Sequence, residues 1–219
     1  MLESLVDLLP GLGVAFGQTL AMLGIGVCAA ILFGGPLGIL LFIVGAGPAA
    51  SRPLARLLGW TVDMIRSFPF LILLVALLPL TRLVAGGSIG PLAACVPLSI
   101  AAVPYFARLV EQTLRDVPQG VIDAARAMGA SKLQVVVHVV LVEARPGLVL
   151  ALTVFATAFL SYATVAGVAG GGGLGALAFH AGYERFETDI MVFTVAVLAA
   201  LVQVMQLTGA RLARRLDHG

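Results

Sequence analysis

The side chains that could do chemistry in this sequence are few and far apart. The three histidines, His138, His180 and His218, have no companion His or Cys at the spacing of a zinc site. Cys28 and Cys95 each lie in an apolar run, where a thiol behaves as a small hydrophobic group, so both are interpreted as packing residues. The sequence also lacks a G-x-S-x-G signature. It therefore predicts no catalytic site, no metal and no cofactor in this chain.

A glycine run, Gly170 to Gly175, formally contains the G-x-G-x-x-G pattern. That pattern binds a dinucleotide only when a strand precedes it, whereas here it follows a long apolar segment. A P-loop needs a lysine, and the only one in the chain, Lys132, lacks the required context. The chain is therefore not expected to hydrolyse ATP through a Walker motif, and the glycine run is expected to form a flexible external turn.

Hydroxyl groups are densest in one apolar stretch of the sequence. A hydroxyl in lipid needs a hydrogen-bond partner, so these groups either bond to helix carbonyls or line an aqueous path. Ser161 and Tyr162 are predicted to line a translocation pathway. The full set comprises Thr153, Thr157, Ser161, Tyr162 and Thr164.

The largest hydrophilic interruption runs from Glu111 to Glu143 and predicts two short helices. Asp116 is expected to cap the first, with Pro118 in its first turn. Gly129 is placed to end it in a left-handed conformation. The second helix is expected to begin at a capping box and to end before the proline that precedes the next apolar stretch. These three residues are Ser131, Gln134 and Pro146.

The first loop helix, residues 118–129, is predicted to be amphipathic. At 100° per residue, Gln119, Asp123 and Arg126 share one side, and Val121, Ala125 and Met128 share the opposite side. With a single Arg and no bulky anchors, the helix is unlike one that floats on lipid. Docking into a partner's groove and packing under its own bundle both remain open, with docking favoured because small residues allow close approach.

The elements around these residues are predicted to lie in a membrane. Of 219 residues, 60% are hydrophobic and 11% are charged, and the mean hydropathy is +1.09. A soluble domain is about 25% charged. At roughly 20 apolar residues per span, the length allows roughly four to six helices and no further domain of ordinary size. The net charge of +2, without a long basic block, argues against nucleic acid as a partner.

Charge-free stretches predict a single all-α transmembrane domain over residues 1–219 with five helices, because each charge is costly at bilayer depth. Two pairs of glycines four residues apart, Gly13 with Gly17 and Gly34 with Gly38, are expected to let helices approach closely or kink. The predicted spans are about 13–44, 58–80, 89–107, 146–168 and 190–210, with a cytoplasmic loop at 111–145.

The distribution of Lys and Arg predicts the orientation. Ten of them lie in residues 45–57, 107–145 and beyond 210, whereas Arg82 and Arg185 alone lie in the opposite set of loops. Basic residues mark the cytoplasmic side, so the N-terminus is expected outside and the C-terminus in the cytoplasm. The acidic N-terminus is unlike a secretory signal, so the first helix is expected to stay in the mature chain.

The loop sequence resembles the EAA loop of binding-protein-dependent ABC importer permeases. Two departures stand out: Asp123 occupies a position that is usually Glu, and Val142 stands where a Leu-Pro pair is usual. Other passages of the chain look most like permeases of the methionine importer family. The passages that carry the resemblance are 123–130, 140–148, 66–70, 79–82 and 170–183.

The resemblance implies a type I ABC importer permease in the bacterial inner membrane. Two copies would form the translocation pathway for methionine, two cytoplasmic ABC ATPases would bind Mg-ATP, and an extracytoplasmic methionine-binding protein would deliver the substrate. The glycine run would lie near the binding-protein docking face or the gate. A permease for another amino acid or an osmolyte, or a non-transporting membrane scaffold, are the alternatives. The implied ATPase-coupling residues are Asp123, Ala124, Ala125, Arg126, Ala127, Met128 and Gly129.

Overall fold

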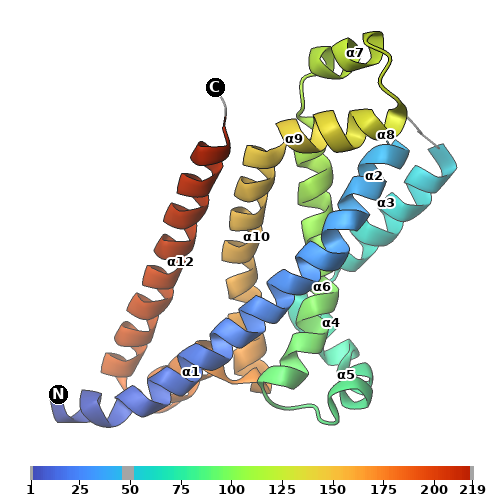
Figure 1. Ribbon diagram of the computed structural model, residues 1–219. Helices are drawn as coiled ribbons and strands as arrows, with labels where there is room; N and C mark the ends of the chain where they lie inside the picture. The colour runs from blue at the N-terminus through green and yellow to red at the C-terminus, as the bar shows by residue number, and fades with distance from the viewer. Residues whose placement is uncertain (1, 46–51, 218–219) are drawn as a thin grey trace. The chain divides into compact units, whose positions relative to one another are not determined.

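The computed structural model describes residues 2–45 and 52–217, and all regular structure in those ranges is helical (Figure 1). The predicted all-α fold class is therefore confirmed. The α-helices are α1 (Leu2–Ala29), α2 (Gly35–Gly45), α3 (Arg52–Ser67), α4 (Phe70–Ala76), α5 (Leu78–Ala85), α6 (Pro91–Arg115), α7 (Gln119–Ala127), α8 (Lys132–Gln134), α9 (Leu141–Glu143), α10 (Arg145–Ala166), α11 (Gly173–Leu177) and α12 (Thr188–Leu216). The π-helical segments are η1 (Ala30–Gly34), η2 (Val135–Val140), η3 (Gly167–Gly171) and η4 (Ala178–Glu184).

Four stretches of the described chain are long and apolar enough to cross a membrane as continuous helices, and a fifth is obtained if the helices on both sides of Pro69 are taken as one span. Each is longer than the minimum of roughly 20 residues. The continuous stretches are Pro10–Gly45, Pro91–Arg115, Arg145–Gly171 and Thr188–Leu216.

The predicted second span, 58–80, is wrong as one unbroken helix. α3 ends at Ser67, and Pro69 has an extended ψ of 130° before α4 begins. A second break at Leu77 separates α4 from α5. Proline disfavours helical geometry at the residue before it and has no N–H to continue the helix, which explains the break at Pro69.

The chain comprises two compact units, each with its own core. Unit 1 contains residues 1–28, 68–101 and 156–205, and its most buried large side chains include Met22, Leu98, Phe159 and Leu174. These apolar side chains come from α1, α6, α10 and α11, and their packing holds the unit together.

Unit 2 contains residues 29–67, 102–155 and 206–219. Its core brings together Leu41, Val62 and Ala107 from α2, α3 and α6. A Cβ atom built on Gly38 would lie 2.5 Å from the Ala107 carbonyl oxygen, so only glycine allows this approach of α2 to α6. The prediction of close helix contact at Gly34 and Gly38 is confirmed, because Gly34 makes a similar contact with the Val103 carbonyl. For Gly13 and Gly17 it is wrong within the described chain, because a Cβ atom built on either meets no described atom within 4 Å.

The two cysteines differ in their surroundings. Cys95 is buried in α6, and its thiol donates to the Pro91 carbonyl oxygen at 3.1 Å, as expected for a packing residue. Cys28 is exposed, so its interpretation as a packing residue within this chain is wrong. The helical face around Cys28 turns away from the chain's own core, and sequence hydrophobicity alone does not reveal that direction.

Candidate functional site

We call residues 111–145 the coupling loop, after the role that the resemblance implies. Its first helix, α7, begins after Pro118 and not at the predicted cap, Asp116. Pro118 is the N-cap residue of α7, with φ −58° and ψ 128°. The predicted cap Asp116 lies instead at the end of α6, where its N–H donates to the Gln112 carbonyl. The prediction for Asp116 is therefore wrong. Pro118 fixes the backbone just before the helix, and the Val121 N–H donates to its carbonyl oxygen.

α7 ends just before Gly129, as predicted. Gly129 has φ +87°, in the left-handed region. The Ala130 N–H donates to the Ala125 carbonyl at 3.1 Å and the Gly129 N–H donates to the Arg126 carbonyl at 3.0 Å, which is the Schellman arrangement. The prediction for Gly129 is confirmed.

The second loop helix begins at the predicted capping box. The Ser131 hydroxyl accepts from the Gln134 N–H at 3.4 Å, and the Gln134 side chain accepts from the Ser131 N–H at 2.8 Å. The helix then continues as the π-helical segment η2, in which Val135, Val136 and Val140 are buried. It ends at Ala144, and α10 starts at the next residue, with Pro146 in its first turn.

One side of α7 packs against its own chain. Ile122 and Ala125 are only 6% and 5% exposed, and α7 lies against η2 (Figure 1). This contact anchors the helix on the second half of the loop. Self-packing, one of the two fates left open by the sequence, is therefore correct for this side of α7.

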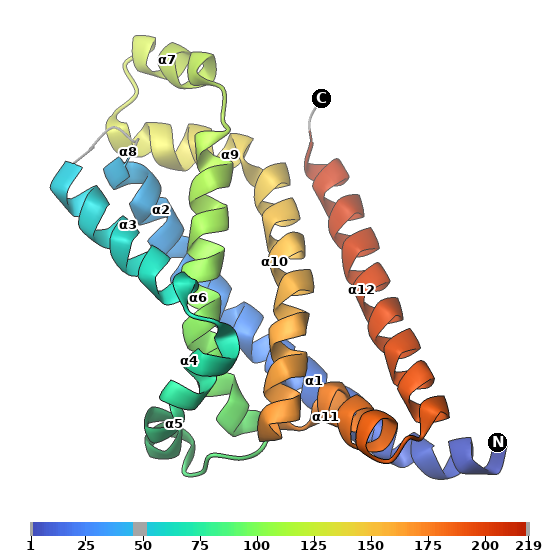
Figure 2. The ribbon, with the colours of Figure 1, turned by 180° about the vertical axis from the view of Figure 1, so that it is seen from behind.

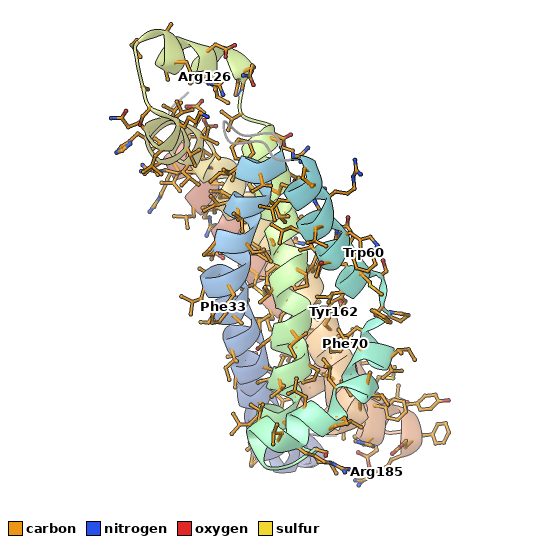
Figure 3. All side chains as sticks on the ribbon, turned by 90° about the vertical axis from the view of Figure 1, so that its right-hand side faces the viewer. Phe33, Trp60, Phe70, Arg126, Tyr162 and Arg185 are labelled. Carbon is orange, nitrogen blue, oxygen red and sulfur yellow. The ribbon has the colours of Figure 1, made fainter. Side chains whose placement is uncertain are left out.

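A second side of α7 is polar and exposed. The Gln119 amide donates to Asp123 Oδ1 at 3.2 Å, and Arg126 Nη1 donates to the same oxygen at 3.5 Å. Figure 3 shows the Arg126 side chain on this loop. The predicted grouping of these three side chains is confirmed. Exposed pairs of this kind contribute little to stability, which leaves Asp123 and Arg126 available for contacts with a partner.

A third side of α7, which we call the small face, is free. Gly120, Ala124 and Ala127 are exposed, and Met128 beside them is 83% exposed. A Cβ atom built on Gly120 meets no described atom within 4 Å. The predicted apolar side is therefore partly wrong: Val121 and Met128 are exposed on the small face, while Ala125 is buried on another side. The prediction divided α7 into a polar and an apolar side, whereas the structure has three: one buried, one polar and one formed by small exposed residues.

An ionic network around one buried carboxylate fixes the base of the coupling loop. Glu111 was predicted to begin the hydrophilic loop, but it lies inside α6 and is 3% exposed. Its two carboxylate oxygens accept from Arg108 at 2.5 Å and Arg115 at 2.6 Å. Arg108 also donates to Asp63 at 2.7 Å and to the Gly59 carbonyl at 2.8 Å, so it joins α6 to α3. A buried carboxylate needs such partners, and Arg108 and Arg115 supply them.

A cavity of about 450 Å³ opens beside both ends of the coupling loop. Leu109, Leu150 and Val154 contribute apolar wall, and Asp116 and Glu143 lie at its lining where the loop leaves α6 and returns to α10. A movement of either end of the loop therefore changes the wall of this cavity.

The two predicted pathway residues lie in α10 in different surroundings. Ser161 is exposed, whereas Tyr162 is half-buried and its ring stacks on Phe70 with centroids 4.9 Å apart, as Figure 3 shows. Among the neighbouring hydroxyls, Thr153 and Thr164 donate to the carbonyls of Val149 and Leu160 in their own helix. Bonding to the same helix, one of the predicted alternatives, is therefore correct for Thr153 and Thr164.

The glycine run is closely packed rather than a flexible turn, so that prediction is wrong. A Cβ atom on Gly175 would lie 2.3 Å from the Thr164 carbonyl oxygen, and one on Gly167 would lie 2.4 Å from the Gly172 carbonyl oxygen. Gly170, Gly172 and Gly173 have φ between +78° and +105°. The glycines allow two helical segments to pack backbone against backbone and the chain to reverse between them.

Sequence analysis did not identify two residues that hold the glycine run in place. The Gln18 side chain accepts from the Gly173 N–H at 2.7 Å, and the Thr19 hydroxyl accepts from the Leu174 N–H at 2.9 Å. Figure 2 shows α11 beside α1. We call these two side chains the α1 cap. One signal was available: Gln18 and Thr19 are the only amide and hydroxyl side chains in the predicted span 13–44.

The segment after α11 ends in aromatic side chains, of which Tyr183 and Phe186 are exposed and Phe179 is half-buried. Phe179 and Tyr183 stack with centroids 5.3 Å apart, and Phe186 is 83% exposed with φ +59°. The Glu187 N–H donates to the Ala181 carbonyl across this turn at 3.1 Å. We call Phe179, Tyr183 and Phe186 the aromatic end. It presents apolar surface next to the start of α12.

Together, the membrane helices and the coupling loop with its free helix face define a membrane subunit of a transport system. Residues 34–218 match the family described as binding-protein-dependent transport system inner membrane component. The chain belongs to that family. The resemblance to importer permeases is confirmed, and the chain is a permease subunit of a transporter.

Similar proteins agree with this assignment. The chain is 44% identical over 202 residues to the probable D-methionine transport system permease protein MetI of Vibrio cholerae, covering 92% of this chain and 90% of that one. It is 42% identical over 151 residues to the D-methionine transport system permease protein MetI of Escherichia coli K12, covering 68% and 70%.

Two solved structures are also similar. One, from inward-facing conformations of the MetNI methionine ABC transporter, is 39% identical with a TM-score of 0.88 and covers 92% of this chain and 94% of that one. Another, from an amino acid ABC transporter with histidines, has a TM-score of 0.73 at 21% identity, with coverage of 96% and 94%, and shares the fold.

Proposed function

We propose that this chain is the membrane permease of an ATP-driven importer of methionine. The names of the Vibrio cholerae and Escherichia coli relatives support the substrate, and the solved methionine transporter supports the class of machine. Substrate identity rests on these relatives, because a thioether offers a protein mainly apolar contact. A permease for another amino acid or an osmolyte is the runner-up.

The observation that carries the proposal is the free small face of α7. Gly120, Ala124 and Ala127 leave room for a partner's backbone, while Ile122 and Ala125 fix the helix to the permease itself. A helix mounted in this way transmits force in both directions. A non-transporting scaffold would give no reason to expose this surface on a helix with defined ends.

The partner on this face is a cytoplasmic ABC ATPase, and two copies of it bind Mg-ATP. Two copies of the permease form the pathway between them, with Ser161 and Tyr162 in its lining. ATP hydrolysis belongs to the ATPase subunits, since this sequence contains no Walker motif.

The coupling loop and the C-terminus lie in the cytoplasm and the helices in a bacterial inner membrane, an orientation that the basic residues around the loop support. The N-terminus, the glycine run and the aromatic end then face outward. An extracytoplasmic methionine-binding protein delivers the substrate there, and lipid covers the remaining apolar helix surfaces.

Reconstitution into liposomes tests the proposal. The permease assembled with its ATPase is expected to take up labelled methionine only when ATP is enclosed in the liposomes, on the side of the ATPase, and the binding protein is present outside. The permease alone is the matched control and is expected to remain closed. Uptake by the permease alone, or uptake of an osmolyte but not of methionine by the full assembly, would contradict the proposal.

A further inference from the structure

Two side chains of the first membrane helix supply the N-terminal cap of α11. The N-cap residue of α11 is Gly172, which has no side chain to accept from the first N–H groups of the helix. Gln18 and Thr19 of α1 accept from Gly173 and Leu174 instead, at 2.7 Å and 2.9 Å. A cap that is normally local is here provided from a different helix.

The position of Thr19 is fixed by more than this one bond. Thr19 is 2% exposed, and its hydroxyl donates to the Ala15 carbonyl at 3.0 Å while it accepts from Leu174. A Cβ atom on Gly173 would lie 2.6 Å from the same hydroxyl oxygen, so the two helices are in direct contact at this point. The hydroxyl proton is committed to α1, which leaves the oxygen lone pairs for α11.

Loss of the α1 cap would leave two backbone N–H groups without partners inside a membrane protein. Such groups are costly in apolar surroundings, so α11 has a strong preference for the docked position. The two sides of α11 are supported unequally. The glycine run packs tightly on the end of α10, whereas Tyr183 and Phe186 of the aromatic end are exposed. The α1 cap therefore binds the segment between its closely packed glycine run and its exposed aromatic side chains.

We propose that Gln18 and Thr19 are positioning residues of the transport cycle. By capping α11 they hold the segment 172–184 against α1 and keep the pathway closed on the outer side until the binding protein engages the aromatic end. This inference rests on the proposed function for its direction and partner. The contact of the α1 cap with α11 is observed within this chain and does not depend on the proposed function.

Thr19→Val and Thr19→Ser are a matched pair, because Val has nearly the shape of Thr without the oxygen and Ser keeps the oxygen. Amide exchange at Leu174 in the purified transporter is expected to be about tenfold faster in Thr19→Val and close to wild type in Thr19→Ser. ATP hydrolysis without binding protein is expected to rise about tenfold in Thr19→Val only.

Gln18→Leu provides an independent variant if Thr19→Val does not fold. It removes the acceptor for Gly173 and leaves a shorter, branched apolar side chain, and is expected to raise hydrolysis without binding protein in the same way. A purely structural role would lower the thermal midpoint and reduce hydrolysis with and without binding protein in proportion. That proportional loss, or wild-type exchange at Leu174 in both variants, would overturn the proposal.

The two proposals fail in different ways. If wild-type transporter hydrolyses ATP but does not take up methionine, the proposed substrate is wrong, while exchange at Leu174 and hydrolysis without binding protein still test the α1 cap. If wild-type transport is normal and Thr19→Val behaves like Thr19→Ser, the α1 cap has no positioning role and the transport function stands.

Discussion

The coupling loop and the glycine run both interrupt apolar helices, but their ends are fixed in different ways. In the coupling loop, Ser131 and Gln134 cap each other and Gly129 ends α7, so the partners are three to five residues apart. In the glycine run, Gly173 and Leu174 are capped by side chains 155 residues earlier in the chain.

This difference suits two kinds of task. Local caps define where α7 begins and ends without fixing every side of it, so one side packs on η2 and another stays free. Distant caps and backbone contacts join α11 to other helices, and a change there affects several helices at once. The first arrangement is suited to a surface that binds a partner, the second to a joint within the membrane domain.

The largest effect is expected at the base of the coupling loop, where a buried carboxylate holds two arginines and one of them, Arg108, also reaches α3. Glu111→Ala leaves Arg108 and Arg115 without their shared buried carboxylate and should cost about 3 kcal/mol of unfolding free energy. Glu143→Ala, at an exposed position of the same loop, is the control and should change it by less than about 0.5 kcal/mol. Thermal unfolding in detergent measures both, and equal midpoints would show that the network is not a structural support.

A slightly smaller effect is expected when a side chain is added inside the glycine run. Gly175→Val places atoms against the Thr164 backbone, which has no room to yield, and should cost about 2 kcal/mol. Gly120→Ala in α7 is the matched change, since it meets open space and replaces glycine in a helix. It should stabilise the protein by up to about 1 kcal/mol. Similar thermal midpoints for the two variants would contradict the contrast between the regions.

The smallest effect is expected from a local cap. Ser131→Ala removes the acceptor for the Gln134 N–H and should cost about 1 kcal/mol, confined to the coupling loop. Ser131→Asp keeps an acceptor at the N-cap and serves as the control. Hydrogen exchange should accelerate at residues 132–136 and remain unchanged at Leu174. Faster exchange at Leu174 would show that the two regions are coupled more tightly than their separate contacts imply.

The contrast also explains what the sequence could predict. The Gly129 stop and the Ser131 capping box depend on neighbours within a few residues, and both were predictable from local rules. The α1 cap depends on which helices become neighbours, so the amide of Gln18 and the hydroxyl of Thr19 gave no indication of their partners. Glu111 was misplaced for a different reason: charges were interpreted as the start of a loop, whereas Arg108 and Arg115, three and four residues away in the same helix, pair with its carboxylate.

The amphipathic character of α7 was predicted correctly, but its division into one polar and one apolar side was incomplete. Ala125 resembles Ala124 and Ala127 in sequence, yet it is buried against the chain while the other two are exposed. A bulky residue at Ala125 would therefore disturb the permease itself and cannot test partner docking. Ala124 is the position at which the two effects separate.

The most direct test of the coupling role is co-purification of the ATPase with Ala124→Trp in mild detergent, with Ala124→Ser as the matched control. The small face is expected to be blocked by the indole, so Ala124→Trp should lose the ATPase while keeping the wild-type thermal midpoint of the permease, and Ala124→Ser should retain it. A full complement of ATPase on Ala124→Trp, with normal methionine uptake, would contradict the assignment of α7 as the coupling helix.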